Sequence, residues 1–132
     1  MPVSKKPKPY NNGQWTVARF NSFVKGALRS ASNRWGPKFS VMKKARVARG
    51  VYRCGGYNIE PHDVAVTVAV RGKGRIRNVA VDHIKPIVDP KLGFVSWDDI
   101  IRRMFVEEEG LQVLCKECHD KKTADERKQR NV

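Results

Sequence analysis

Apolar residues recur at helical spacing in the first third of the chain. Steps of three and four residues after Thr16 predict a helix whose apolar face is formed by Phe20, Phe23, Val24, Ala27, Leu28, Ala31 and Trp35. Thr16 is a suitable N-cap, and Gly36 followed by Pro37 is a suitable end. Ser40 is expected to cap a second helix over residues 41–49.

The pattern changes to that of strands after Gly50. Residues 51–54 are typical of a short strand that enters a turn at Gly55 and Gly56. Alternating valines over residues 64–70 and a second apolar alternation over 75–81 flank the glycine-rich segment 71–74. This arrangement predicts a β-hairpin with a basic tip.

The last third of the chain combines both patterns. Ser96, with Asp99 three residues later, is expected to cap a helix that runs to about Glu108. A short strand over residues 111–114 and a helix from His119 toward Gln129 follow. The sequence therefore predicts an α+β fold.

Charge indicates the class of partner. The 132 residues include 27 Lys and Arg against 13 Asp and Glu, a net charge of +14, which favours a polyanion such as DNA. Residues 1–14 have no apolar periodicity and are expected to form a flexible basic arm, followed by a basic helical region over 15–50. The candidate DNA-binding residues are Lys6, Lys8, Arg19, Lys25, Arg29, Lys43, Lys44, Lys73, Arg75 and Lys122. Ordinary solvated surface charge accounts for such residues equally well.

Segments for membrane insertion or export are absent from the sequence pattern. No run approaches the roughly 18 apolar residues that span a bilayer, and the basic, proline-containing N-terminus lacks an apolar signal segment. We therefore expect a cytoplasmic protein without a membrane partner. In a reducing compartment, three cysteines that include the pair Cys115 and Cys118 favour metal binding over disulfides, with zinc as the usual metal.

Two strings carry a family resemblance. The sequence VDHIKP over residues 81–86, together with LQVLCKECHDKKT over residues 111–123, resembles the signature of the HNH endonucleases. The resemblance implies a ββα-metal core, built from two strands and a helix, within a nuclease domain over residues 51–132. The whole chain also resembles small free-standing HNH endonucleases of bacteriophages, which would place it in the host cytoplasm.

The resemblance implies a role for each of three side chains. His83 is the expected general base, and Asp82 and His119 are the expected ligands of a catalytic Mg²⁺ or Mn²⁺ ion. The chemistry agrees, because hydrolysis of a DNA phosphodiester needs a base for water and a cation for the phosphate. Neighbouring residues on a strand point to opposite sides, so Asp82 and His83 can serve these separate tasks. A small-molecule substrate is not expected.

The chain departs from the family pattern at two positions. Gly110 stands where the family usually has an Asn that helps to orient the base histidine, so a backbone carbonyl held by another residue, such as Gln112 or Glu109, is expected to replace it. Tyr57 stands where the first of two zinc knuckles would have its second cysteine. A structural Zn²⁺ would then be bound by Cys54, Cys115 and Cys118, with His62 or a water as the fourth ligand. Without zinc, the cysteines would pack as small apolar residues.

Three functions remain open from the sequence. The first is an active endonuclease that nicks one strand, or cuts both as a homodimer or in two successive events. The second is an HNH-fold DNA-binding protein whose catalysis is weakened or lost because of Gly110. The third is a basic, zinc-stabilised structural or RNA-binding protein.

Overall fold

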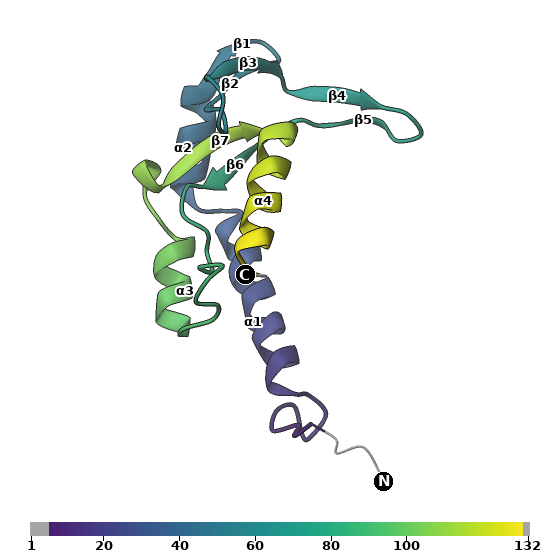
Figure 1. Cartoon of the computed structure of the whole chain (residues 1–132), viewed down its shortest axis with the longest axis vertical. Helices are drawn as coiled ribbons and strands as arrows, with labels where there is room; N and C mark the ends of the chain where they lie inside the picture. The colour runs from purple at the N-terminus through teal and green to yellow at the C-terminus, as the bar shows by residue number, and fades with distance from the viewer. Residues whose placement is uncertain (1–5, 131–132) are drawn as a thin grey trace. The chain divides into compact units, whose positions relative to one another are not determined.

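The fold belongs to the α+β class and combines helices with small antiparallel sheets (Figure 1). The computed structural model describes residues 6–130. The chain divides into two units, the first ending at Arg34 and the second beginning at Trp35. The predicted α+β class is confirmed. The division between the units falls within the basic helical region expected over 15–50.

A short turn opens the described part of the first unit. The main-chain N–H of Trp15 donates to the carbonyl of Tyr10 at 2.9 Å. The ring of Tyr10 stacks on Phe20, with ring centroids 3.9 Å apart. The expected flexible arm, residues 1–14, thus includes a hydrogen-bonded turn at its end, and its residues 1–5 lie outside the described part of the chain.

Helix α1 (Val17–Ser32) begins at the predicted cap and ends earlier than predicted. Thr16 Oγ1 accepts a hydrogen bond from the main-chain N–H of Arg19 at 3.2 Å, which satisfies one of the free donors of the first turn. The helix ends at Ser32, and α2 (Gly36–Ala45) starts where α1 was expected to end. Ser40 lies inside α2 instead of capping a helix over 41–49.

Trp35 is the physical reason for this difference. Its indole Nε1 donates to the carbonyl of Val106 at 2.7 Å, and its ring packs edge-on against Phe105 at 5.5 Å between centroids. The Trp35 backbone is extended, and Pro37 lies in the first turn of α2, where its missing N–H costs no helical hydrogen bond. The apolar periodicity therefore runs across a helix break that a contact 71 residues away along the chain produces.

The strands form three separate antiparallel sheets. The first has the order β1-β2-β3, the second pairs β4 with β5, and the third pairs β6 with β7. Their bounds are β1 (Arg46–Ala48), β2 (Val51–Cys54), β3 (His62–Ala65), β4 (Thr67–Val70), β5 (Gly74–Arg77), β6 (Val79–His83) and β7 (Leu111–Cys115).

The predicted hairpin is present, but each of its long strands is split in two. β4 and β5 form the hairpin and extend away from the rest of the second unit (Figure 1). The flanking segments β3 and β6 pair elsewhere, with β2 and β7. The change occurs at Val66, whose N–H donates to Gly50, and at Asn78, whose side-chain amide donates to the carbonyl of Ala65 at 3.0 Å. Alternation alone could not indicate this exchange of partners.

β6 and β7 form the frame of the candidate site. In their register Val79 lies opposite Cys115, and Asp82 lies opposite Gln112. Helix α4 (Lys116–Arg130) follows β7 without a loop, so the first turn of the helix begins directly at the sheet. Figure 1 shows α4 beside this pair of strands.

The core of the second unit is small and is centred on β7. Four of its five residues are buried: Leu111, Val113, Leu114 and Cys115. Helix α3 (Trp97–Met104), capped by Ser96 as predicted, contributes the buried side chains of Ile100 and Met104. The 3₁₀ turn η1 (Glu108–Gly110) then leads into β7. None of the helices in the described residues is long and apolar enough to cross a membrane.

The contact of Trp35 with Val106 makes a first prediction. Trp35→Phe keeps an aromatic ring but removes the indole donor, and we expect it to lower the free energy of unfolding by about 1 kcal/mol. Trp35→Ala also removes the ring packing of a half-buried side chain and should cost about 2–3 kcal/mol. Denaturant unfolding measures both values. Two variants with the wild-type midpoint would show that Trp35 does not join α2 to the segment after α3.

Candidate functional site

Asp82 is a carboxylate that hydrogen bonds from two other elements hold in place. It lies on β6, and its side chain is 13% exposed. Oδ2 accepts two hydrogen bonds, one from Lys122 Nζ at 2.7 Å and one from Gln112 Nε2 at 3.1 Å. Oδ1 faces the other way and lies 3.6 Å from Nε2 of His119. The carboxylate therefore has one oxygen held by the protein and one directed at an imidazole.

His119 meets Asp82 because α4 starts directly after β7. The helix begins at Lys116, so His119 lies in its first turn, on the side that faces β6. Its side chain is 45% exposed and so is reachable from solvent. The structure thus brings together Asp82 and His119, the two residues that the sequence assigned to one metal ion.

The pair has a geometry that suits a divalent ion. Two donor atoms on one ion, each about 2.1 Å from it, lie about 3.0–3.4 Å apart. The observed 3.6 Å between Asp82 Oδ1 and His119 Nε2 needs only a small adjustment. One carboxylate oxygen and one imidazole nitrogen leave the other coordination positions for water or a phosphate oxygen, as Mg²⁺ and Mn²⁺ allow.

His83 is held by the main chain on the opposite side of β6. Its Nε2 lies 2.7 Å from the carbonyl oxygen of Met104, at the end of α3. A carbonyl can only accept, so Nε2 carries the proton and Nδ1 of the neutral ring is the acceptor. A backbone carbonyl was expected at this place, but its residue, Met104, was not predicted, because a main-chain atom leaves no signal in the sequence. Gln112 bonds Asp82 instead of serving the histidine.

Gly110 has a steric reason to be glycine. A Cβ atom at this position would lie 2.8 Å from Cγ2 of Val106 and 2.9 Å from its Cβ. The carbonyl of Gly110 accepts a hydrogen bond from the main-chain N–H of Ile84 at 3.0 Å, which places Gly110 beside the end of β6. An asparagine could not occupy Gly110 without movement of Val106, and the Met104 carbonyl provides the contact that orients His83.

Lys122 occupies a different environment from the one expected. The sequence grouped it with the DNA-binding lysines, but the residue is 9% exposed. Its ammonium contacts Asp82, the carbonyl of His83 at 2.6 Å and Glu126 at 3.3 Å. The first two contacts are hydrogen bonds and the third is an ion pair, so the ammonium is engaged within the protein and Lys122 is not the exposed DNA-binding lysine that was expected.

A second group of side chains lies on the other end of β7. The sulfur atoms of Cys54, Cys115 and Cys118 and a ring nitrogen of His62 all lie within 4.8 Å of one another. Cys54 and His62 face each other across β2 and β3, and the three cysteines are free and buried. The structure therefore assembles the four residues that the sequence proposed for a metal, including His62. We call them the Cys3His cluster.

Burial dominates the electrostatics of the Cys3His cluster. Burial raises the pKa of the Cys118 thiol to about 11, with further contributions from Cys115 and Cys54. Contact with Cys115, whose sulfur lies 3.6 Å from Nε2 of His62, raises the pKa of His62. A bound cation would reverse the cost of ionising these thiols.

Tyr57 has a structural role in the place of the missing cysteine. Its hydroxyl donates to Oδ2 of Asp125 on α4 at 2.6 Å, and its ring packs against the Cys3His cluster. This hydrogen bond raises the pKa of Tyr57. The loop after β2 is thus attached to α4 by Tyr57, and His62 completes the set of four metal-ligating side chains in its stead.

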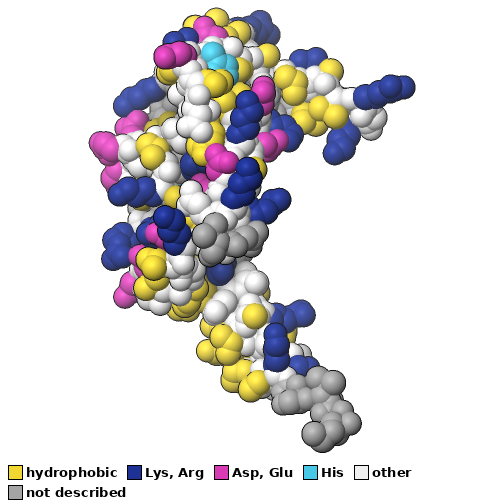
Figure 2. Space-filling view, in the orientation of Figure 1, with side chains coloured by type: hydrophobic (Ala, Val, Ile, Leu, Met, Phe, Trp, Pro, Cys, Tyr) yellow, Lys and Arg dark blue, Asp and Glu magenta, His cyan; other side chains and the backbone are white. Residues whose placement is uncertain are grey.

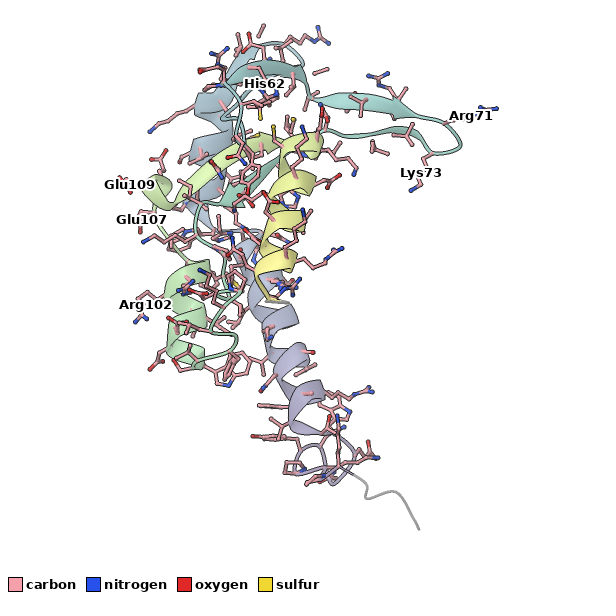
Figure 3. The ribbon with its side chains drawn as sticks, in the orientation of Figure 1. His62, Arg71, Lys73, Arg102, Glu107 and Glu109 are labelled. Carbon is pink, nitrogen blue, oxygen red and sulfur yellow. The ribbon has the colours of Figure 1, made fainter. Side chains whose placement is uncertain are left out.

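Most of the other basic residues singled out in the sequence lie on the surface. Lys25 is half-buried, and the exposed ones are Lys6, Lys8, Arg19, Arg29, Lys43, Lys44, Lys73 and Arg75. Lys44 is paired with Glu108 at 2.9 Å, and Arg75 donates to Thr67 on the neighbouring strand. Arg71 and Lys73 lie at the hairpin tip (Figure 3), and Figure 2 shows Lys and Arg side chains on the surface at that end of the hairpin.

A shallow pocket of about 270 Å³ adjoins His119. Its lining includes two basic side chains, Arg77 and Lys116, together with Ala80 on the same strand as Asp82. Lys116 is paired with Asp120 at 2.7 Å. The pocket provides room for a charged group next to the pair formed by Asp82 and His119.

The candidate site thus consists of the ends of two paired strands and the first turns of one helix. The Cys3His cluster includes Cys115 at one end of the β6–β7 pair, whereas Asp82 and His83 lie at the other end of β6. His119 reaches Asp82 from the first turn of α4. No known family model, curated protein or solved structure matches this chain.

Proposed function

We propose that the protein is a metal-dependent endonuclease of the HNH class, in which β6, β7 and α4 form the ββα-metal core. The observation that carries the proposal is the pair of donor atoms, Asp82 Oδ1 and His119 Nε2, at 3.6 Å beside a strand end that also holds His83. The substrate is DNA, as the net charge of +14 favours.

The residues divide the chemistry of phosphodiester hydrolysis among them. Nδ1 of His83 accepts the proton of the attacking water, while the Met104 carbonyl keeps the ring in its orientation. Asp82 and His119 would hold a Mg²⁺ or Mn²⁺ ion, which supplies positive charge to the phosphate and to the departing oxygen. Arg77 and Lys116, which line the pocket beside His119, would bind the neighbouring phosphate.

The hairpin β4–β5 adds affinity that does not depend on base sequence. From residue 64 to residue 81 the chain has no acidic side chain and has the four basic residues Arg71, Lys73, Arg75 and Arg77. A two-stranded ribbon of this kind fits the width of a DNA groove, and its exposed cations can neutralise phosphates. The hairpin therefore acts as a second contact, separate from the site of cleavage.

Zinc is the proposed occupant of the Cys3His cluster. Three thiols and one imidazole form a typical closed set of four ligands, as in structural zinc sites. The metal would join β2 and β3 to the junction of β7 and α4, where the first turn that bears His119 begins. Its role would be to stabilise the fold rather than to take part in cleavage.

The second candidate function is DNA binding without cleavage. The observation that favours it is Gly110, which lacks the side chain expected at that place in the HNH signature. Incubation of supercoiled plasmid with the protein and Mg²⁺ or Mn²⁺ separates the two functions. Nicked or linear product that disappears with a chelator supports the endonuclease, and binding without product supports the alternative.

Replacement of His83 tests the assignment of the base. His83→Ala should fold and bind Mn²⁺ and DNA, yet cleave roughly two to four orders of magnitude more slowly, because a general base contributes about that factor. Asp82→Ala and His119→Ala should instead weaken Mn²⁺ binding and regain part of their activity at high Mn²⁺. Cleavage rates and Mn²⁺ titrations are measured on protein from identical preparations. Cleavage by His83→Ala at the wild-type rate would place the active site elsewhere.

Zinc content tests the Cys3His cluster. Elemental analysis should find about one equivalent of zinc, and its removal by a chelator should lower the melting temperature, because metal binding is coupled to folding. Cys54→Ser should lose the metal and the sensitivity to the chelator together. An unchanged melting temperature after complete removal of the metal would contradict a structural zinc.

The hairpin prediction concerns salt dependence. Replacement of Arg71 and Lys73 by Ala should weaken DNA binding and lower the slope of log K against log salt by about 2, near one for each phosphate that the hairpin no longer neutralises. The control is the double replacement of Lys91 and Arg102, two exposed cations outside the hairpin, which removes the same charge. Equal slopes for the two variants would argue that only net charge matters.

A further inference from the structure

Lys122 is a buried cation one turn after His119 on α4. An ammonium removed from water needs partners, because an isolated buried charge is very costly. Lys122 Nζ contacts three oxygen atoms: it donates hydrogen bonds to Asp82 Oδ2 at 2.7 Å and to the carbonyl of His83 at 2.6 Å, and it forms an ion pair with Glu126 Oε1 at 3.3 Å. Two of these acceptors belong to the consecutive residues that the proposed nuclease uses as metal ligand and base.

The contact with Asp82 determines which oxygen of the carboxylate is available. Lys122 and Gln112 both donate to Oδ2, so the plane of the carboxylate is fixed by two donors from two different elements, α4 and β7. Oδ1 is thereby turned toward Nε2 of His119. Without these donors the Asp82 side chain could rotate, and Oδ1 would no longer be the oxygen that faces His119.

The contact with His83 fixes the main chain at the same point. Its carbonyl lies at the end of β6, where the strand leaves its pairing with β7 after Leu111. The Lys122 ammonium holds this carbonyl while the Met104 carbonyl holds the ring of the same residue. The backbone and the side chain of His83 are therefore fixed by separate contacts from α4 and α3.

We propose that Lys122 is a positioning residue of the active site, which presents Oδ1 of Asp82 to the divalent ion and fixes the strand end that bears His83. This inference rests on the proposed nuclease function. It replaces the expected contact of Lys122 with DNA, because the residue is buried and its ammonium donates two hydrogen bonds and forms an ion pair with Glu126 within the protein. Lys122 acts through Asp82 and His83 and touches neither the ion nor the substrate.

A competing role of Lys122 predicts the opposite change in metal affinity when the residue is replaced. The ammonium could simply occupy Asp82 and repel a divalent ion, in which case its removal would tighten ion binding. Positioning predicts weaker binding, because residues that orient metal ligands typically change metal affinity or activity about 10–100-fold when they are replaced. The affinity of the free protein for Mn²⁺ therefore distinguishes the two roles without any measurement of cleavage.

The test is a Mn²⁺ titration of zinc-loaded, full-length Lys122→Met, with free Mn²⁺ followed by electron paramagnetic resonance. Methionine keeps the approximate length of the side chain and removes its charge. We expect the Mn²⁺ dissociation constant to rise about 10–100-fold. DNA affinity of the zinc-loaded protein, measured without added Mg²⁺ or Mn²⁺, should stay within a factor of two of wild type. Unchanged or tighter Mn²⁺ binding, or a large loss of DNA affinity, would overturn the proposal.

The matched control is Lys121→Met, on the residue next to Lys122. Its ammonium is paired with Glu117 on the surface, and its side chain is 54% exposed. The variant loses the same charge from the same turn of α4 and should leave Mn²⁺ affinity unchanged. If Lys121→Met weakens Mn²⁺ binding as much as Lys122→Met, the effect is one of net charge and the positioning role is excluded.

Gln112→Leu keeps the proposal testable if Lys122→Met does not fold. It removes the other donor to Oδ2 from a half-buried position on β7. We expect a smaller loss of Mn²⁺ affinity, about 2–10-fold, as the loss of one hydrogen bond would give. Wild-type affinity in this variant would show that the donors to Oδ2 do not position Asp82. Wild-type protein that fails to bind Mn²⁺ at all would instead refute the proposed function.

Discussion

The hydrogen-bond ladder between β6 and β7 is the constraint on which both candidate sites depend. Its register places Val79 opposite Cys115 at one end and His83 opposite Leu111 at the other. Because side chains alternate along a strand, a slip of one residue would exchange the faces of Asp82 and His83. The same slip would move Cys115 relative to Cys54. At present the main-chain N–H of Cys115 donates to the sulfur of Cys54 at 3.2 Å.

Charge is distributed unevenly in this basic protein. The surface is rich in cations, while two of the 13 acidic residues, Asp82 and Glu126, share one buried ammonium. This internal pairing offsets the cost of placing a carboxylate in a half-enclosed position. The long-range field that attracts a polyanion and the local field that orders the site therefore arise from different residues.

The sequence predicted those parts of the molecule whose signals are local. Thr16 and Ser96 cap their helices as expected, and strand alternation correctly indicated that the segments around Asp82 and Val113 are extended. The four residues of the Cys3His cluster could be named because cysteine and histidine are rare and suit few tasks.

What could not be predicted depends on distant contacts or on main-chain atoms. Lysine is most often a surface residue, and nothing near Lys122 in the sequence shows that α4 places it over β6. Every residue has a main-chain carbonyl, so no sequence pattern could single out that of Met104 as the partner of His83. Trp35 continues the apolar period of α1, but its hydrogen bond to Val106 fixes it outside that helix, at the N-cap of α2.

The direct junction of β7 with α4 has a consequence for how such a protein can change during evolution. Cys115, Cys118 and His119 are distributed between two sites within five consecutive residues, with no loop between strand and helix. One inserted residue would turn every later side chain of α4 by about 100° about the helix axis and disperse both groups at once. Residues 86–95, between β6 and α3, supply no side chain to either group and can vary in length far more freely. Insertions and deletions are therefore tolerated in the connection between β6 and α3, whereas at the junction of β7 and α4 they would disrupt both groups.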